Sequence, residues 1–172
     1  MPNVGDITRD VTVQSFQSLN GDNQTIAMVG WNYQAGKKVS LFAGGGYDTN
    51  FKDNLGLAFD VKGKYQFDEN HSIQARIRSL HSDKKNTTQF RISPGWQEQL
   101  GKNTSIYLNP YYAYKIDYNN NKHSHSVGAY GGISYKTGNT TLSLEGQRYN
   151  LQVPEDNSGK NWSINLIISY KF

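Results

Sequence analysis

The carboxyl-terminal segment of the chain alternates between apolar and polar residues. From Trp162 to Phe172 every second side chain is large and apolar, and the positions between them are polar except for Ile167. A period of two is that of a β-strand, in which successive side chains point to opposite faces of the sheet. The segment therefore predicts a terminal strand with one apolar face and one polar face.

The same alternation recurs along the rest of the chain, with turn-forming residues between the segments. No segment shows the period of a helix. Near Arg148 and Tyr149 the alternation slips, which predicts a bulge or a bent strand end. We therefore expect an all-β fold, an antiparallel up-and-down meander of about ten strands. The predicted strands occupy residues 9–18, 24–34, 39–47, 55–67, 73–78, 90–96, 106–118, 127–135, 142–146 and 162–172.

Composition is compatible with a membrane barrel but not with a spanning helix. The chain of 172 residues is 35% hydrophobic and contains no apolar run long enough to cross a bilayer as a helix. A barrel strand needs no continuous apolar run, because only its alternate residues meet lipid. The absence of cysteine excludes disulfides and thiolate chemistry. We expect one domain over residues 1–172 with residues 1–8 as a flexible lead-in, and a leader peptide already removed.

The last three residues, Tyr170-Lys171-Phe172, resemble the aromatic-x-Phe closing-strand signal of small Gram-negative outer-membrane β-barrel proteins. The resemblance implies a transmembrane β-barrel in the cell outer membrane, in contact with membrane lipid and lipopolysaccharide. It also implies recognition of the terminal strand by the barrel-assembly machinery. With Phe172 on the periplasmic side, an even number of strands places both termini there, and the connections on the opposite side are mostly longer.

Aromatic residues gather near the ends of the predicted strands, where a membrane barrel has its two interfaces. A soluble barrel or sandwich would give the same alternation with its apolar face turned inward, but it does not call for aromatics at both strand ends. We therefore place the apolar rows toward lipid and the polar rows toward the barrel axis. The expected interface aromatics are Trp31, Tyr65, Trp96, Tyr135, Trp162, Tyr170 and Phe172.

The polar rows carry eight basic and four acidic residues, so the interior should be net positive. Glycines share this face, and each either admits a neighbouring ring or leaves open space. Ten strands enclose a narrow lumen, or one plugged by its own side chains. The residues expected to line a solute pathway are Lys62, Lys64, Arg76, Arg78, Arg91, Lys115, Asp60, Asp117 and Glu145.

Two functions follow from this interior. A narrow, net-basic channel would conduct small anionic solutes, acidic saccharides among them, because basic pore linings favour anions. In architecture such a channel resembles small outer-membrane channels for anionic oligosaccharides, which have more strands. Alternatively, Asp60, Asp117 and Glu145 neutralise the basic residues in a closed barrel with a structural or adhesive role.

A third alternative is an enzyme that modifies lipids or peptides at the outer leaflet. Its candidates are His81-Ser82-Asp83 and His123-Ser124-His125-Ser126, at the expected outer ends of strands. Adjacent residues on a strand point to opposite faces, so His81 and Ser82 do not readily pair for nucleophilic catalysis. We therefore assign no catalytic residue. His123 and His125 share a face and allow adventitious metal binding, but the sequence has no motif for a metal, a cofactor or nucleic acid.

Pro94 and Pro110 lie inside two consecutive predicted strands, and each lacks the N–H that a sheet ladder uses. A bulge is the simpler explanation. The alternative is a locally weak seam that opens sideways to lipid.

Overall fold

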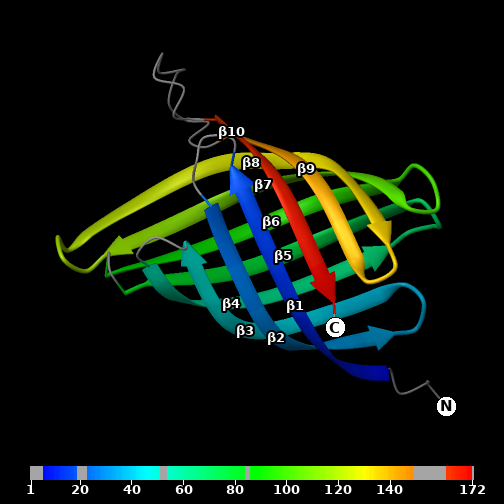
Figure 1. Ribbon diagram of the computed structural model, residues 1–172, viewed down its shortest axis with the longest axis horizontal. Helices are drawn as coiled ribbons and strands as arrows, with labels where there is room; N and C mark the ends of the chain where they lie inside the picture. The colour runs from blue at the N-terminus through cyan, green and yellow to red at the C-terminus, as the bar shows by residue number, and fades with distance from the viewer. Residues whose placement is uncertain (1–5, 19–22, 51–53, 84–85, 149–161, 172) are drawn as a thin grey trace.

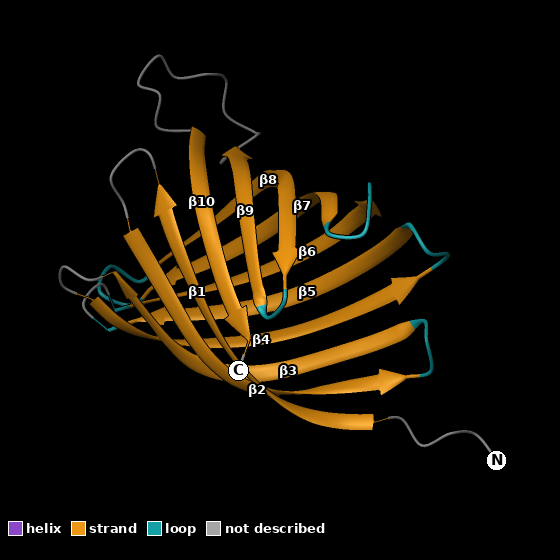
Figure 2. Ribbon diagram, turned by 45° about the vertical axis from the view of Figure 1, so that its right-hand side comes forward, coloured by secondary structure: helices purple, strands orange, loops and turns teal. Residues whose placement is uncertain are grey.

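The computed structural model describes residues 6–18, 23–50, 54–83, 86–148 and 162–171. Every regular element in these ranges is a strand (Figure 2). No helix in the described part of the chain is long and apolar enough to span a membrane. The strands are β1 (Asp6–Ser18), β2 (Asn23–Ala35), β3 (Val39–Asn50), β4 (Asn54–Gln66), β5 (His71–Ser82), β6 (Thr87–Gln99), β7 (Thr104–Asp117), β8 (Lys122–Thr137), β9 (Thr140–Arg148) and β10 (Trp162–Lys171).

The ten strands form a closed antiparallel barrel in which each strand pairs with its neighbours in sequence. Closure is made by β1 and β10, which pair from Thr12 opposite Lys171 to Ser18 opposite Asn165. Strand β1 begins and β10 ends at the same end of the barrel (Figure 1). The predicted all-β, up-and-down topology of about ten strands is confirmed.

The barrel is apolar outside and polar inside. Phe59 on the outward face of β4 is 58% exposed, whereas its neighbour Asp60 is 2% exposed. On β7 the same contrast separates Leu108, which is 54% exposed, from Asn109, which is 1% exposed. A soluble barrel would bury the apolar row. This distribution is that of a transmembrane barrel, whose outer surface faces acyl chains.

The connections are shorter than predicted at the end of the barrel opposite the termini. At that end three or four residues separate consecutive strands at every connection except the one between β9 and β10. Strands β3 and β8 account for much of the difference, because they run on through residues that were predicted to form loops.

At the opposite end of the barrel Asp68 stabilises the β4–β5 turn. Its carboxylate accepts hydrogen bonds from the backbone N–H groups of Asn70 and His71, and these bonds lower the pKa of Asp68.

At several inward glycines a neighbouring side chain occupies the space that a Cβ would take. Gly30 and Gly44 lie opposite each other on β2 and β3, and the ring of Phe42 covers both. A Cβ added at Gly30 would lie 2.5 Å from Cε2 of that ring, and one at Gly44 would lie 2.6 Å from Cζ. Tyr111 occupies the corresponding space at Gly128. These rings reduce the free cross-section of the lumen.

The described ladders each keep a single register from end to end, so none contains a bulge. The bulge expected near Arg148 is absent up to that residue, which pairs regularly with Trp162; Tyr149 lies outside the described residues. The bulge expected at the prolines is wrong, because the β6–β7 ladder keeps its register across them. Pairing between β6 and β7 stops after Ile92 opposite Tyr112 and resumes in the same register at Trp96 opposite Leu108.

This register places Pro94 directly opposite Pro110, and the ladder lacks three consecutive residue pairs there. In an antiparallel ladder, hydrogen-bonded and non-hydrogen-bonded pairs alternate. Two prolines at a hydrogen-bonded position remove both N–H donors of that pair. The non-hydrogen-bonded pairs on either side are then flanked by hydrogen bonds on one side only. A gap of three pairs is therefore the expected result of a proline facing a proline.

On the inward face of this gap a side-chain hydrogen bond crosses the weakened seam. Asn109 lies over Gly95, where an added Cβ would overlap the Asn109 amide. The Asn109 Oδ1 accepts a hydrogen bond of 2.6 Å from Nε2 of Gln74 on β5. The side chain of β7 thus reaches across β6 to the next strand and ties the three strands together where the backbone ladder is interrupted.

Replacing Asn109 by leucine should lower the free energy of unfolding by about 1–3 kcal/mol, because the half-buried Gln74 amide would lose its acceptor at the seam. Urea unfolding of the barrel in detergent, followed by tryptophan fluorescence, measures this change. The control is Lys102→Ala in the exposed β6–β7 turn, which should shift stability by less than about 0.5 kcal/mol. Equal unfolding midpoints for the two variants would contradict the role of Asn109.

Amide hydrogen exchange should be faster on the β7 side of β6 than on its β5 side. The N–H groups of Ile92 and Trp96 flank the gap toward β7, whereas those of Ser93 and Gly95 point to the continuous β5 ladder. Residue-resolved exchange in micelles compares the two sets within one strand. Uniform protection of all four amides would show that the seam is not locally weak, and would remove the case for a sideways opening.

Candidate solute pathway

Five basic side chains form one inward patch on three adjacent strands, which we call the basic wall. Strand β4 contributes Lys62 and Lys64, β5 contributes Arg76 and Arg78, and β6 contributes Arg91. Lys62 lies directly opposite Arg76, and Arg78 lies directly opposite Arg91. Like charges in opposed positions repel each other, so this patch requires a counter-charge or solvent.

Asp60 is the one acidic residue at the centre of the basic wall, and it is shared by two arginines. Its carboxylate accepts hydrogen bonds from Nε of Arg76 at 2.8 Å and from Nη2 of Arg78 at 2.9 Å, and Nη2 of Arg76 also contacts it. The Asp60 side chain is almost fully buried beneath them. One carboxylate between two guanidinium groups leaves the cluster with a net positive charge. Nε of Arg78 is buried and finds no hydrogen-bond partner among the described residues.

Arg91 is held by an aromatic ring instead of a carboxylate. Its guanidinium carbon lies 4.3 Å from the ring centroid of Tyr111, a cation–π contact. Among the described residues no carboxylate lies within ion-pair distance of Arg91. The Tyr111 hydroxyl accepts a hydrogen bond of 3.3 Å from Nε2 of Gln147 on β9, which fixes the ring beneath the arginine.

The part of the lumen formed by β7 to β10 carries tyrosines and one buried acid. Glu145 on β9 accepts a 3.0 Å hydrogen bond from the hydroxyl of Tyr107 on β7, and Asn165 on β10 also bonds to it. The rings of Tyr111 and Tyr130 have centroids 6.2 Å apart. The interior is thus divided between the basic wall on β4 to β6 and a mainly aromatic and amide wall on β7 to β10.

The remaining predicted pathway residues lie outside this central region. Lys115 is half-buried near the end of β7 and directly opposite Ser124. Asp117 caps the β7–β8 turn, where its carboxylate accepts hydrogen bonds from the backbone of Asn119 and Asn120. That acid is therefore engaged at the rim and does not neutralise the basic wall. The assignment of all nine residues to a solute pathway stays a prediction.

Six of the seven predicted interface aromatics have described side chains, and all six are exposed. Trp31, Tyr65, Trp96, Tyr135, Trp162 and Tyr170 are each between 37% and 60% exposed. The guanidinium carbon of Arg148 lies 5.2 Å from the ring centroid of Trp162, a cation–π contact. Phe172 lies outside the described residues. The role of these rings as interface anchors stays a prediction.

The histidines proposed for catalysis or metal binding point outward and contact residues other than the adjacent serines. His81 bonds through Nδ1 to Thr88 and lies near Asp83. His123 and His125 bond to Tyr114 and Tyr112. In the described part of the chain no three histidine, aspartate or glutamate side chains group as a metal site would require.

Sequence reasoning missed an apolar patch inside the lumen. Ile26, Met28 and Ala58 are buried on the inward face and pack with Leu80. Gly46 lies between Met28 and Ala58 in the register, so the absence of a side chain on β3 lets the flanking strands meet. The signal was present, because Ile26 and Met28 occupy even positions on β2, opposite in phase to the lipid-facing row.

Comparison with known proteins gives a likeness of fold. No protein-family model and no curated protein sequence matches the chain. The structure is similar to that of a protein described as KdgM porin, with a TM-score of 0.60 and 13% identity over 95% of this chain and 99% of that one. The de novo designed barrel TMB2.3 has a TM-score of 0.42 at 15% identity, covering 100% and 98%. A loop-deletion mutant of OmpT from Vibrio cholerae, an outer membrane protein, has a TM-score of 0.48 at 14% identity, covering 87% and 54%.

Asp60→Asn should destabilise the barrel by about 1–3 kcal/mol, because it leaves two partly buried guanidinium groups without their anion. Urea unfolding in detergent measures the loss. The matched control is Asp83→Asn, where the carboxylate is largely exposed and the contact with His81 should contribute little. Adding Arg76→Gln to Asp60→Asn removes one of the unpaired cations and should recover part of the loss. A double variant that is less stable than Asp60→Asn would argue against the shared carboxylate as the cause.

Proposed function

We propose that the protein is an outer-membrane barrel that forms a narrow, net-basic channel for small anionic solutes. Acidic saccharides fit this interior as a substrate class, because their carboxylates match the guanidinium groups and their rings can stack on tyrosine. Both termini lie on the periplasmic side in this proposal, and the β5–β6 and β7–β8 turns lie outside. The protein assembles through its terminal strand with the barrel-assembly machinery.

The outer-membrane placement is supported by the exposed apolar band and by the fold. The band covers the outward faces of β2 to β10, and aromatic side chains lie on the same surface. A β-barrel satisfies every backbone hydrogen bond internally only if it closes, as this one does between β1 and β10. The likeness to KdgM porin supports the same placement.

The anion preference rests on one observation, the basic wall. Its five cations converge from three strands, and Asp60 is the sole acid ion-paired with them in the described part of the chain. Glu145, the other buried acid, is bonded to Tyr107 and Asn165 and interacts with the charges of Arg91 and Arg76 only at longer range. An excess of fixed positive charge in a narrow, low-dielectric passage attracts anions and repels cations.

A closed barrel with a structural role is the second candidate, and the filled interior favours it. Phe42 and Tyr111 occupy the space over inward glycines, and the apolar patch at Met28 narrows the lumen further. Many inward polar groups are bonded to each other, among them Gln97 with Lys64 and Ser105. The two candidates share one fold and differ in whether ions pass.

Purified protein in planar bilayers should conduct, with a reversal potential under a KCl gradient that indicates chloride preference. The variant Lys62→Gln/Lys64→Gln/Arg91→Gln should lose most of this preference, because it removes three cations of the basic wall without disturbing the Asp60 cluster. Single-channel recording gives both the conductance and the selectivity.

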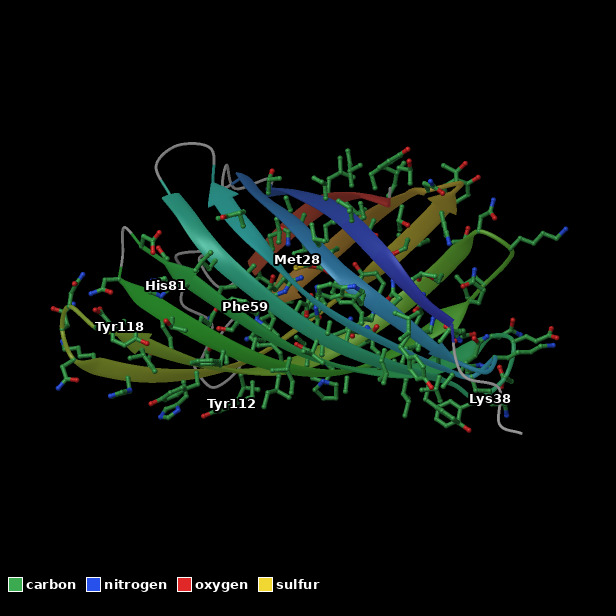
Figure 3. The ribbon with its side chains drawn as sticks, turned by 90° about the horizontal axis from the view of Figure 1, so that it is seen from below. Met28, Lys38, Phe59, His81, Tyr112 and Tyr118 are labelled. Atoms are coloured by element: carbon green, nitrogen blue, oxygen red, sulfur yellow. The ribbon has the colours of Figure 1, made fainter. Side chains whose placement is uncertain are left out.

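The matched control is Lys37→Gln/Lys38→Gln/Lys102→Gln. It removes the same number of charges from exposed positions in the β2–β3 and β6–β7 turns, at the end of the barrel where Figure 3 labels Lys38. It should keep the chloride preference. Heat-modifiable gel migration verifies that each variant is folded. Folded protein that leaves bilayers silent favours the closed barrel, and cation preference would contradict the proposed selectivity.

A further inference from the structure

Four rings on the outward face of the β7–β8 hairpin form a cluster that the channel does not use. We call Tyr112, Tyr114, His123 and His125 the His–Tyr stack. The hairpin reaches furthest from the barrel at the left of Figure 1, and Figure 3 shows Tyr112 on the outer side of the ribbon. Both histidines are exposed, and Tyr112 is 44% exposed.

The rings are stacked in alternation along the hairpin. The centroid of Tyr114 lies 5.8 Å from that of His123, with the rings nearly parallel at 12°, and 5.5 Å from that of His125. Tyr112 lies 6.2 Å from His125 and extends the stack toward the centre of the barrel. Tyr114 therefore contacts both imidazoles, which keeps them from converging on a single metal ion.

Each imidazole is oriented by a tyrosine hydroxyl from the neighbouring strand. Nδ1 of His123 lies 2.7 Å from the hydroxyl of Tyr114, and Nδ1 of His125 lies 2.9 Å from that of Tyr112. When the hydroxyl donates to Nδ1, the ring proton resides on Nε2. Residues two apart on a strand lie about 6.5–7 Å apart and share a face. The stack then presents two Nε2–H donors to the same side.

Among the described residues these donors have no protein acceptor. His71 and His81 each lie against a carboxylate, that of Asp68 or Asp83, whereas no described carboxylate lies within ion-pair distance of His123 or His125. In the described part of the chain, neither β7 nor β8 places an acidic side chain on its outward face; Asp117 belongs to the inward row. Two oriented donors without a neighbouring negative charge suit an external anion.

We propose that the His–Tyr stack binds the phosphate of an outer-leaflet lipid headgroup. Below the stack the outward rows of β7 and β8 continue as apolar or small residues that would meet acyl chains, among them Leu108, Pro110 and Ile133. The group that meets the stack at the end of these rows is therefore a headgroup rather than a dissolved solute. This inference rests on the outer-membrane placement proposed above and is independent of ion conduction.

The test titrates diphosphoryl lipid A, and the same lipid with its phosphates removed, into protein solubilised in maltoside detergent. Native mass spectrometry measures the bound lipid, and the ¹⁵N shifts of the imidazoles report the contact. His123→Phe/His125→Phe keeps the rings but removes both donors, and should weaken binding of the diphosphoryl lipid by roughly tenfold or more. Tyr112→Phe/Tyr114→Phe, which releases both imidazoles, should give a smaller loss. His71→Phe at the opposite end is the control and should bind as the parent does.

Unchanged affinity in His123→Phe/His125→Phe would overturn the proposal, as would equal binding of the dephosphorylated lipid. Inorganic phosphate that shifts the imidazole signals at the same concentration as the lipid would overturn the lipid assignment. Loss of lipid binding in His123→Phe/His125→Phe, with heat-modifiable migration retained, supports the proposal even if bilayers remain silent. Failure of the parent protein to insert into bilayers would instead refute the membrane placement on which the inference rests.

Discussion

The structure depends on hydrogen bonding between strands in a medium that supplies no water. Every backbone N–H and C=O within a bilayer must find a partner in the protein, and a barrel meets this demand by closing on itself. Here the pairing of β1 with β10 closes the barrel, and each described ladder keeps one register. Because the register never shifts, the inward and outward rows remain separate along the whole length of each strand. The apolar exterior and the charged interior are both consequences of this regularity.

Within the described ladders the pairing is interrupted at one place, Pro94 opposite Pro110, which shows how a barrel accommodates missing donors. The chain does not shift its register or insert a residue; instead Asn109 reaches over Gly95 to Gln74 and bonds on the inward side. The interior uses the same solution elsewhere. The Asp60 carboxylate accepts hydrogen bonds from two arginines. The ring of Tyr111 makes a cation–π contact with Arg91, and the Tyr111 hydroxyl accepts a hydrogen bond from Gln147. In these cases the partner is a side chain from the next strand or the one beyond, although the buried Nε of Arg78 has no hydrogen-bond partner among the described residues.

The sequence predicted the strands and their facing, because a period of two is visible without any knowledge of partners. The sequence also predicted that Lys62, Arg76 and Asp60 lie on the inward face. It did not predict that two arginines share the Asp60 carboxylate, because that contact depends on the β4–β5 register. That Pro94 and Pro110 face each other across the two strands could have been predicted from the sequence. Pro94 and Pro110 are equally distant from Lys102 in the middle of the turn. The two His–Tyr hydrogen bonds could not be predicted, because they join diagonal positions in the register and depend on the side-chain rotamers.

The bulge-free ladders and short hairpin turns have a consequence for the history of such a chain. Each hairpin is a self-contained unit of two strands that enters and leaves at the same rim. Duplicating or deleting one hairpin would change the circumference of the barrel by two strands. Every other side chain would keep its orientation toward the lipid or toward the barrel axis. Gene-level copying of a single hairpin could thus widen or narrow the cylinder in even steps, with only the two new joints left to adapt.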